Sequence, residues 1–180
     1  MAFFNELINR FELILNAPFQ DLSVWWVLFP VILFWITLEL YFGKHKSEEL
    51  GWNTALGNGI SLTWITLTLM KFLFDNSLER FTWPKFILVF LIMIYGFFIA
   101  YISFMHKFKS KVTFKLASPS PVYYLASIAI LWSYGSLIID FYLVIALILL
   151  YFIILGLLKL IKKLMPNAEE APKDTFSDLV

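Results

Sequence analysis

The sequence predicts an all-α fold: a polytopic membrane helix bundle with five transmembrane helices and an N-terminal interfacial amphipathic helix. Three observations lead to this prediction. Hydrophobic residues make up 61% of the 180 residues and charged residues only 15%, whereas soluble domains contain roughly 45–50% apolar residues. Several apolar stretches exceed the ~18 residues typical of a membrane-spanning helix. The connections between these stretches are too short to fold as soluble domains.

The first element, at residues 3–17, is expected to be the interfacial helix. Apolar residues recur there at helical spacing, and asparagine, glutamate and arginine fill the opposite face. Such a helix lies in the plane of the membrane surface with its apolar face toward the acyl chains. Pro18 is expected to end it.

The five spans are expected at about 22–42, 53–74, 84–105, 121–139 and 141–161, each near the ~20 residues that cross the hydrocarbon core. The last two are separated by a turn near Gly135 or Asp140. Asp140 is the only charge between 121 and 158, so a turn that brings its carboxylate to the headgroup level is favoured. Residues 1–164 then form a single helical domain, and the polar residues 165–180 form a flexible tail.

The lysines predict the orientation. Most of them lie in the connection after the first span, in the connection after the third span and after the fifth span. The positive-inside rule places these segments in the cytoplasm. The N-terminus is therefore expected outside and the C-terminus in the cytoplasm.

Polar residues concentrate where the first span ends and the second begins. A carboxylate inside an apolar span is a functional candidate, because an ionised group in the membrane is costly. We expect a polar vestibule for a cation, a proton or a lipid headgroup there, formed by Glu39, His45, Glu48, Glu49, Asn53 and Asn58. Alternatively, Glu39 reaches the interface or accepts hydrogen bonds from Asn53 or Asn58.

A polar stripe continues along the second span. Its members recur at helical spacing: Thr54, Ser61, Thr68, Lys71 and Asp75. Such a face is expected to avoid lipid and to pack against neighbouring helices through small residues and hydroxyl groups. Lys71 and Asp75 are spaced for an ion pair, which Asp140 could join at the outer level.

The third connection carries a basic ribbon. Lys107, Lys109, Lys111 and Lys115 alternate with apolar residues at a period of two, which predicts an extended ribbon or short hairpin on the inner surface. Lysines next to a membrane attract anionic lipid headgroups by about 1 kcal/mol each. The partner is therefore expected to be anionic lipid or another protein. Nucleic acid is not expected, because the patch is small and lies against the membrane.

The stretch SEELGW, at residues 47–52, resembles the start of the glutamate motif of CAAX-protease-type intramembrane peptidases, in which paired glutamates precede Gly-Trp-Arg. The resemblance implies a catalytic centre containing Glu48 and Glu49 with histidines from later helices. The chain departs from the motif at Asn53, which stands where the arginine belongs. His106 is the only later histidine, and the resemblance covers six residues.

Three functions follow from these observations. The preferred one is non-enzymatic: a helical scaffold or accessory subunit of a membrane complex, whose partner is another membrane protein or a second copy. The alternative is a small transporter or channel that uses Glu39 and the polar stripe. The third is an intramembrane hydrolase centred on Glu48 and Glu49. No cofactor and no metal site is expected, and the absence of cysteine excludes disulfides and thiol nucleophiles.

Overall fold

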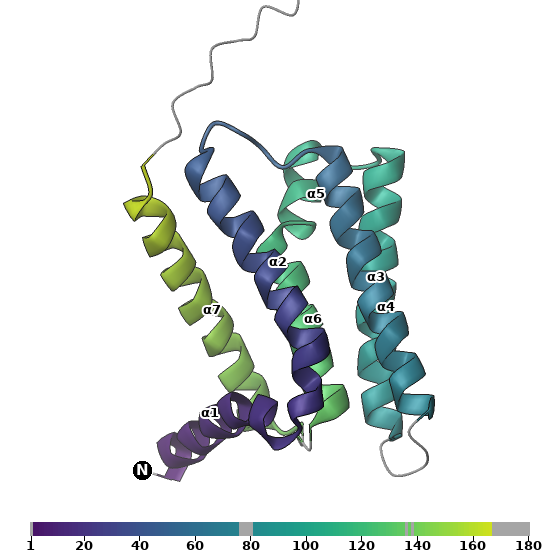
Figure 1. Cartoon of the computed structure of the whole chain (residues 1–180), viewed down its shortest axis with the longest axis vertical. Coiled ribbons are helices and arrows are strands. Elements are labelled where there is room, and N and C mark those ends of the chain that lie inside the picture. Colours follow the sequence, from purple (N-terminus) through teal and green to yellow (C-terminus); the bar gives the residue numbers. More distant parts are fainter. Residues whose placement is uncertain (1, 76–80, 136, 138, 167–180) are drawn as a thin grey trace, which may run out of the picture.

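The computed structural model describes residues 2–75, 81–135, 137 and 139–166, and all of its regular elements are helices (Figure 1). In chain order they are α1 (Ala2–Gln20), the 3-10 helix η1 (Leu22–Val24), α2 (Trp25–Lys44), α3 (Trp52–Asp75), α4 (Trp83–Met105), α5 (Ser110–Leu116), α6 (Pro119–Tyr134) and α7 (Phe141–Leu164). The predicted all-α class is confirmed for the described residues. The expected tail lies outside them from residue 167 onward.

Three helical segments are long and apolar enough to cross a membrane: Leu22–Lys44, Trp83–Met105 and Phe141–Leu164. The other two predicted spans, 53–74 and 121–139, overlap α3 and α6, and α6 ends at Tyr134, earlier than predicted. These two differ in composition and length, because α3 carries polar residues throughout and α6 has only 16 residues. Length and composition thus establish three possible crossings in the described part of the chain.

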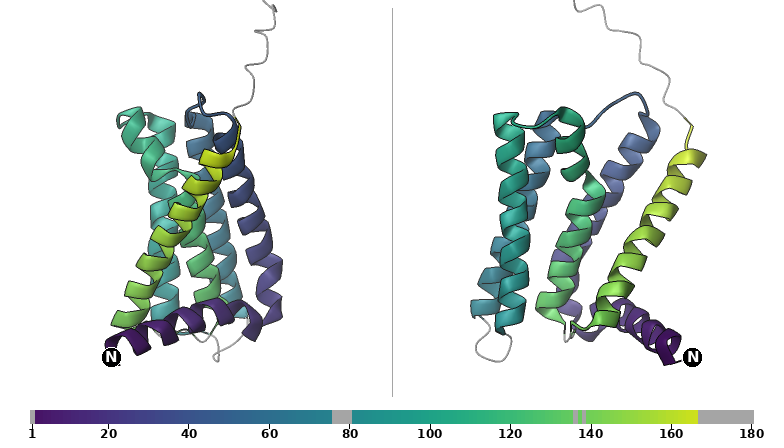
Figure 2. Two further views of the ribbon diagram at one scale, coloured as in Figure 1. Left: turned by 90° about the vertical axis from the view of Figure 1, so that its left-hand side faces the viewer. Right: turned by 180° about the vertical axis from the view of Figure 1, so that it is seen from behind.

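Helix α6 occupies the centre of the bundle and packs against α2, α3 and α4 (Figure 2). Its position explains its composition: small and hydroxyl-bearing residues such as Ala126, Ala129 and Ser133 are fully buried. The Ser133 hydroxyl donates to the Ala129 carbonyl over 2.8 Å, so its burial leaves no unpaired donor. A helix surrounded by protein does not need the uniformly apolar surface that a lipid-facing helix needs.

Helices α3 and α4 form the closest pair, through two glycines. A Cβ atom on Gly59 would lie 2.6 Å from the backbone nitrogen of Ala100. A Cβ atom on Gly96 would lie 2.7 Å from Thr63 Oγ1. Only glycine permits this approach of the two backbones.

Helix α1 lies across the end of the bundle opposite α5, as both figures show. Its buried residues Ile14 and Ala17 pack against Leu143 and Ala146 of α7. The predicted end at Pro18 is wrong, because the helix includes this proline and ends at Gln20. Proline lacks an N–H and weakens the helix locally, but here two further residues keep helical geometry.

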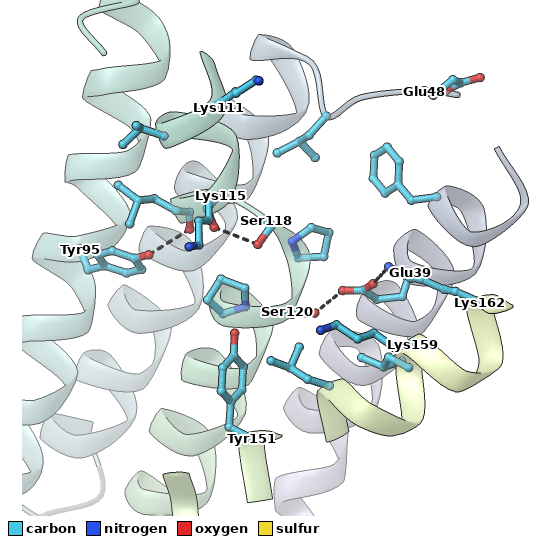
Figure 3. A pocket seen from close by; sticks show the side chains of 18 residues that line it. Glu39, Glu48, Tyr95, Lys111, Lys115, Ser118, Ser120, Tyr151, Lys159 and Lys162 are labelled. Carbon is cyan, nitrogen blue, oxygen red and sulfur yellow. Dashed lines mark hydrogen bonds and ion pairs between the residues drawn. The ribbon is translucent and has the colours of Figure 1, made fainter. Parts of the chain in front are cut away.

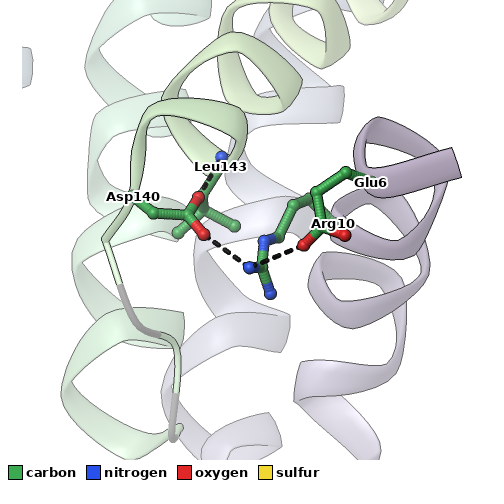
Figure 4. Close-up of polar contacts among 4 residues, drawn as sticks. All are labelled: Glu6, Arg10, Asp140 and Leu143. Carbon is green, nitrogen blue, oxygen red and sulfur yellow. Dashed lines mark hydrogen bonds and ion pairs between the residues drawn. The ribbon is translucent and has the colours of Figure 1, made fainter. Parts of the chain in front are cut away.

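Asp140 joins α1 to α7 (Figure 4). Its Oδ1 atom accepts a 2.7 Å hydrogen bond from the Leu143 amide and caps α7. Its Oδ2 atom lies 2.5 Å from Arg10 Nη2, and Arg10 also pairs with Glu6 at 2.9 Å. Helix α6 ends at Tyr134 and α7 begins at Phe141, so the break between the last two helices falls at the predicted residues, Gly135 to Asp140.

The predicted association of Asp140 with Lys71 and Asp75 is not observed. Lys71 and Asp75 lie 4.0 Å apart as an exposed pair of their own on α3. Asp140 pairs instead with Arg10, which approaches it from α1. The sequence does not predict this pairing, because the polar face of an interfacial helix is expected to point to the headgroups and not to the bundle.

The predicted extended conformation of the basic ribbon is wrong. Residues Ser110–Leu116 form α5, and Thr113 and Ala117 are fully buried at helical spacing. Phe114 packs edge-on against Trp52, whereas Val112 is exposed. The alternating pattern is only a few residues long, so the burial of Thr113 against the bundle decided the conformation.

Candidate functional site: a basic pocket at one end of the bundle

A pocket of about 1050 Å³ opens at the α5 end of the bundle, among α2, α4, α5, α6 and α7 (Figure 3). Its volume is at the upper end of the roughly 300–1,000 Å³ usual for ligand sites. We call it the basic pocket. Its charged lining residues are Glu39, Glu48, Lys111, Lys115, Lys159 and Lys162.

Glu39 is the most enclosed of these groups, with 4% of its surface exposed. Its carboxylate forms an ion pair with Lys162 of α7 and accepts a hydrogen bond from the Ser120 hydroxyl of α6. Trp35 Nε1, one turn earlier on α2, donates to it over 3.4 Å. The carboxylate is thus neutralised by Lys162 and ties three helices together.

The remaining lysines are available to a ligand. Among the described residues, no carboxylate forms an ion pair with Lys111, Lys115 or Lys159. Lys111 and Lys115 come from α5 and Lys159 from α7. Four lysines against two glutamates leave two positive charges in excess. An anion is therefore the ligand that this lining favours.

The deeper lining is mainly apolar. Leu155 and Leu158 of α7 and Leu116 of α5 line the pocket below the lysines. The Tyr95 hydroxyl donates to the Leu116 carbonyl over 2.9 Å. A ligand with an anionic end and an apolar end would match both parts of the lining.

Asn58 holds the α5–α6 junction in place. Its Nδ2 atom donates to the Ala117 carbonyl over 2.8 Å, and its Oδ1 atom accepts from the Tyr123 hydroxyl at 2.9 Å. Asn58 is buried, and all these contacts are internal to the bundle. Its position indicates a structural role beside the pocket, since it is not among the lining residues.

The predicted vestibule is brought together only in part. Glu39 and Glu48 line the basic pocket, whereas Asn53 and Glu49 are exposed and do not line it. His45 stacks on Tyr41 and lies 3.8 Å from Glu48, which also accepts a 2.6 Å hydrogen bond from the Tyr41 hydroxyl. The predicted contacts from Asn53 or Asn58 to Glu39 are not observed, because α6 supplies Ser120 in their place.

The polar stripe of α3 does not face inward along its length. Thr54 and Ser61 are half-buried, whereas Thr68, Lys71 and Asp75 are exposed. The hydroxyls buried in the bundle are those of Thr63 and Thr66, which lie on the face toward α4. Thr68 donates to the Trp64 carbonyl over 3.0 Å, so its hydroxyl is satisfied within its own helix.

The basic ribbon divides into two pairs of lysines. Lys111 and Lys115 line the basic pocket, whereas Lys107 and Lys109 are exposed outside it. The Lys107 ammonium lies 5.4 Å from the centre of the Tyr101 ring. The helical geometry of α5 causes this division, because residues four apart share a face.

The peptidase-like glutamates lie in the connection between α2 and α3, where both side chains are exposed. The His106 ring contacts the Trp52 ring at a tilt, with 4.1 Å between ring centres, and does not approach either glutamate in any described contact. Across the described residues, no group of three His, Asp or Glu side chains is placed to hold a metal ion. The arrangement implied by the resemblance is thus not assembled in this part of the chain.

Sequence reasoning missed the contribution of α7 and α6 to the pocket. The sequence predicts only an orientation role for Lys159 and Lys162 and no role for Ser120. A signal was present: Tyr151, Leu155, Lys159 and Lys162 recur at intervals of four and three, which places them on one helix face.

Comparisons of the chain with protein-family models, with curated proteins and with solved structures return no match. The functional assignment below therefore rests on the geometry of the basic pocket.

Proposed function

We propose that this chain is a multi-pass membrane protein with five crossings that serves as a helical scaffold or accessory subunit and binds an anionic lipid headgroup in the basic pocket. The α5 end faces the cytoplasm in this proposal, and the N-terminus lies outside. The observation that carries the proposal is the convergence of Lys111, Lys115 and Lys159 on one pocket without carboxylate partners among the described residues.

The location of the pocket supports a lipid over a soluble anion. The lysines lie at the end of long apolar helices, where the headgroups of a surrounding bilayer would be. Leucines line the pocket directly below them, next to where the acyl chains of a bound lipid would begin. Basic pockets between membrane helices at the cytoplasmic side are suited to phosphate-bearing lipid headgroups.

The geometry supports the transporter alternative less well. Such a protein needs a polar path that continues from Glu39 across the membrane. Thr68, Lys71 and Asp75, which were expected to line the path, are exposed on the outer face of α3. The Glu39 carboxylate already forms an ion pair with Lys162 and accepts a hydrogen bond from Ser120. A headgroup site needs no such path.

The test compares two variants with equal loss of charge. Purified protein stripped of lipid is titrated with phosphatidylglycerol or with phosphatidylcholine of identical chains, and the complexes are counted by native mass spectrometry. The double variant Lys111→Gln/Lys115→Gln is expected to bind phosphatidylglycerol about thirtyfold more weakly, from about 1 kcal/mol per lysine.

The control is Lys107→Gln/Lys109→Gln, which removes two charges from the same connection outside the pocket. This variant is expected to retain most of its affinity for phosphatidylglycerol. Equal losses in both variants, or equal binding of the two lipids by the unaltered protein, would contradict a headgroup site in the basic pocket.

A further inference from the structure

A second cavity lies on the inward side of α7. The backbone of α7 packs closely on α1 and α2 but approaches α6 at few points. The space between α2, α6 and α7 contains a cavity of about 400 Å³, within the range of ligand sites. Leu158 lines both this cavity and the basic pocket, so the two are adjacent.

The chemistry of this cavity suits a hydrocarbon chain. Its walls are formed mainly by leucine, isoleucine and tryptophan, among them Trp35, Leu150 and Ile154. The two hydroxyl groups on its walls are already engaged. Tyr124 donates to the Leu147 carbonyl over 2.5 Å, and Ser127 donates to the Tyr123 carbonyl over 2.8 Å.

The two spaces lie on adjacent faces of α7 and meet at Leu158. Lys162, Lys159, Leu155 and Tyr151 line the basic pocket, Leu158 lines both, and Ile154, Leu150 and Leu147 line the apolar cavity, which extends further from the lysines. A third cavity of about 210 Å³, also apolar, continues toward the α1 end. It shares Ile128, Leu131 and Leu147 with the second cavity, so the apolar space continues between α6 and α7.

We propose that an acyl chain of the anionic lipid lies in this cavity between α2, α6 and α7, which we call the acyl cavity. The inference rests on the proposed function, because the headgroup in the basic pocket is what directs this chain inward. The bound lipid then fills the space between the backbones of α6 and α7, which side-chain contacts such as that of Tyr124 with Leu147 bridge only in part. The ligand class is a phosphate-bearing lipid with at least one long chain.

Photoreactive lipids test the inference. The protein is reconstituted in phosphatidylcholine vesicles containing a trace of phosphatidylglycerol or phosphatidylcholine with a diazirine midway along one chain. After irradiation, adducts are mapped by mass spectrometry. We expect the phosphatidylglycerol probe to label acyl-cavity residues such as Ile128 and Leu150 about tenfold more than the phosphatidylcholine probe does.

Two neighbouring residues of α7 supply matched variants. Ile154 lines the acyl cavity, whereas Ile153 is exposed on the outer face of the same helix. Ile154→Trp fills the cavity and is expected to abolish the enriched labelling, and Ile153→Trp is expected to leave it unchanged. Ser127→Leu, which fills the cavity from α6, serves as a second test if Ile154→Trp fails to fold.

The outcomes separate this inference from the proposed function. Preferential phosphatidylglycerol binding with adducts spread evenly over the outer faces of the helices would overturn the acyl cavity and leave the headgroup site standing. Equal labelling of the cavity by both probes would overturn the link between headgroup and chain. A loss of lipid preference in the native mass spectra would overturn the proposed function itself.

Discussion

Glu39 can remain in an apolar helix because its partners converge on it from three directions. Lys162 supplies the opposite charge, and Ser120 and Trp35 supply hydrogen bonds. Removing one member of a buried ion pair leaves the other without compensation, which is more costly than removing both. The Lys162 side chain is 33% exposed, so solvent screens its charge and reduces this cost.

A double-mutant cycle tests the ion pair. Glu39→Gln and Lys162→Gln are each expected to reduce the free energy of unfolding by about 1–3 kcal/mol. The double variant is expected to lose less than the sum of the two, because neither partner is left unpaired. Unfolding in detergent, followed by circular dichroism, provides the measurement. Additive losses would show that the two side chains do not interact.

The sequence predicts Glu39 as a candidate site residue but does not predict its partners. An isolated carboxylate in an apolar span can be recognised from composition alone. Ser120 is 81 residues away along the chain, so its contact depends on how α6 packs against α2. The same limit applies to Asn58, whose partners Ala117 and Tyr123 lie 59 and 65 residues away.

At the scale of elements, the α3–α4 contact predicts opposite effects for two glycines of one helix. A Cβ atom on Gly59 would meet backbone atoms of α4, which cannot move aside, whereas Gly57 has nothing within 4 Å. Gly59→Ala is expected to destabilise the protein by about 1–3 kcal/mol through overpacking. Gly57→Ala is expected to be neutral or to stabilise by up to about 1 kcal/mol, because alanine favours the helix. Thermal unfolding distinguishes them, and equal stability would contradict the close contact of α3 with α4.

The docking of α1 depends on Asp140. Asp140→Asn keeps a good helix cap for α7 but removes the charge that faces Arg10. Arg10 Nε is buried and has no hydrogen-bond partner, so losing the carboxylate leaves the guanidinium poorly compensated. We expect the population in which α1 is separated from α7 to rise about fivefold, which corresponds to a loss of ~1 kcal/mol in the free energy of docking.

Cysteine labelling measures this separation, because the chain contains no cysteine of its own. Ala17→Cys places a thiol in the buried α1–α7 contact, and Asn16→Cys places one on the exposed face of the same helix. Asp140→Asn is expected to accelerate maleimide labelling at position 17 but not at position 16. No acceleration at position 17 would show that α1 is held by its apolar contacts alone.

The positions of some long helices were predictable from the sequence. The predicted spans 53–74 and 84–105 differ by one residue at each start from α3 and α4. Short polar segments were less predictable: α5 follows from the burial of Thr113 and Ala117, which only the assembled bundle provides. The outward direction of Thr68 escaped prediction because a hydroxyl bonded to its own helix tolerates an apolar environment.

At the scale of the whole molecule, the proposal of five crossings makes a prediction for each connection. Single cysteines replace Ser47 and Ser110 at the α5 end, and Thr82 and Ile139 at the opposite end, all at exposed positions. In intact cells, a membrane-impermeant maleimide is expected to label positions 82 and 139 but not 47 and 110. Labelling of 139 and 110 from the same side would show that α6 does not cross.

The placement of α1 against α7 also constrains the order of assembly during synthesis. Helix α1 is the first of the described helices to leave the ribosome, yet its main packing partner is the last. The contacts among α2, α3, α4 and α6 can form before α7 is made, whereas Ile14 and Ala17 cannot pack against Leu143 and Ala146 until then. The beginning and the end of the described chain therefore complete the fold together, as its final step.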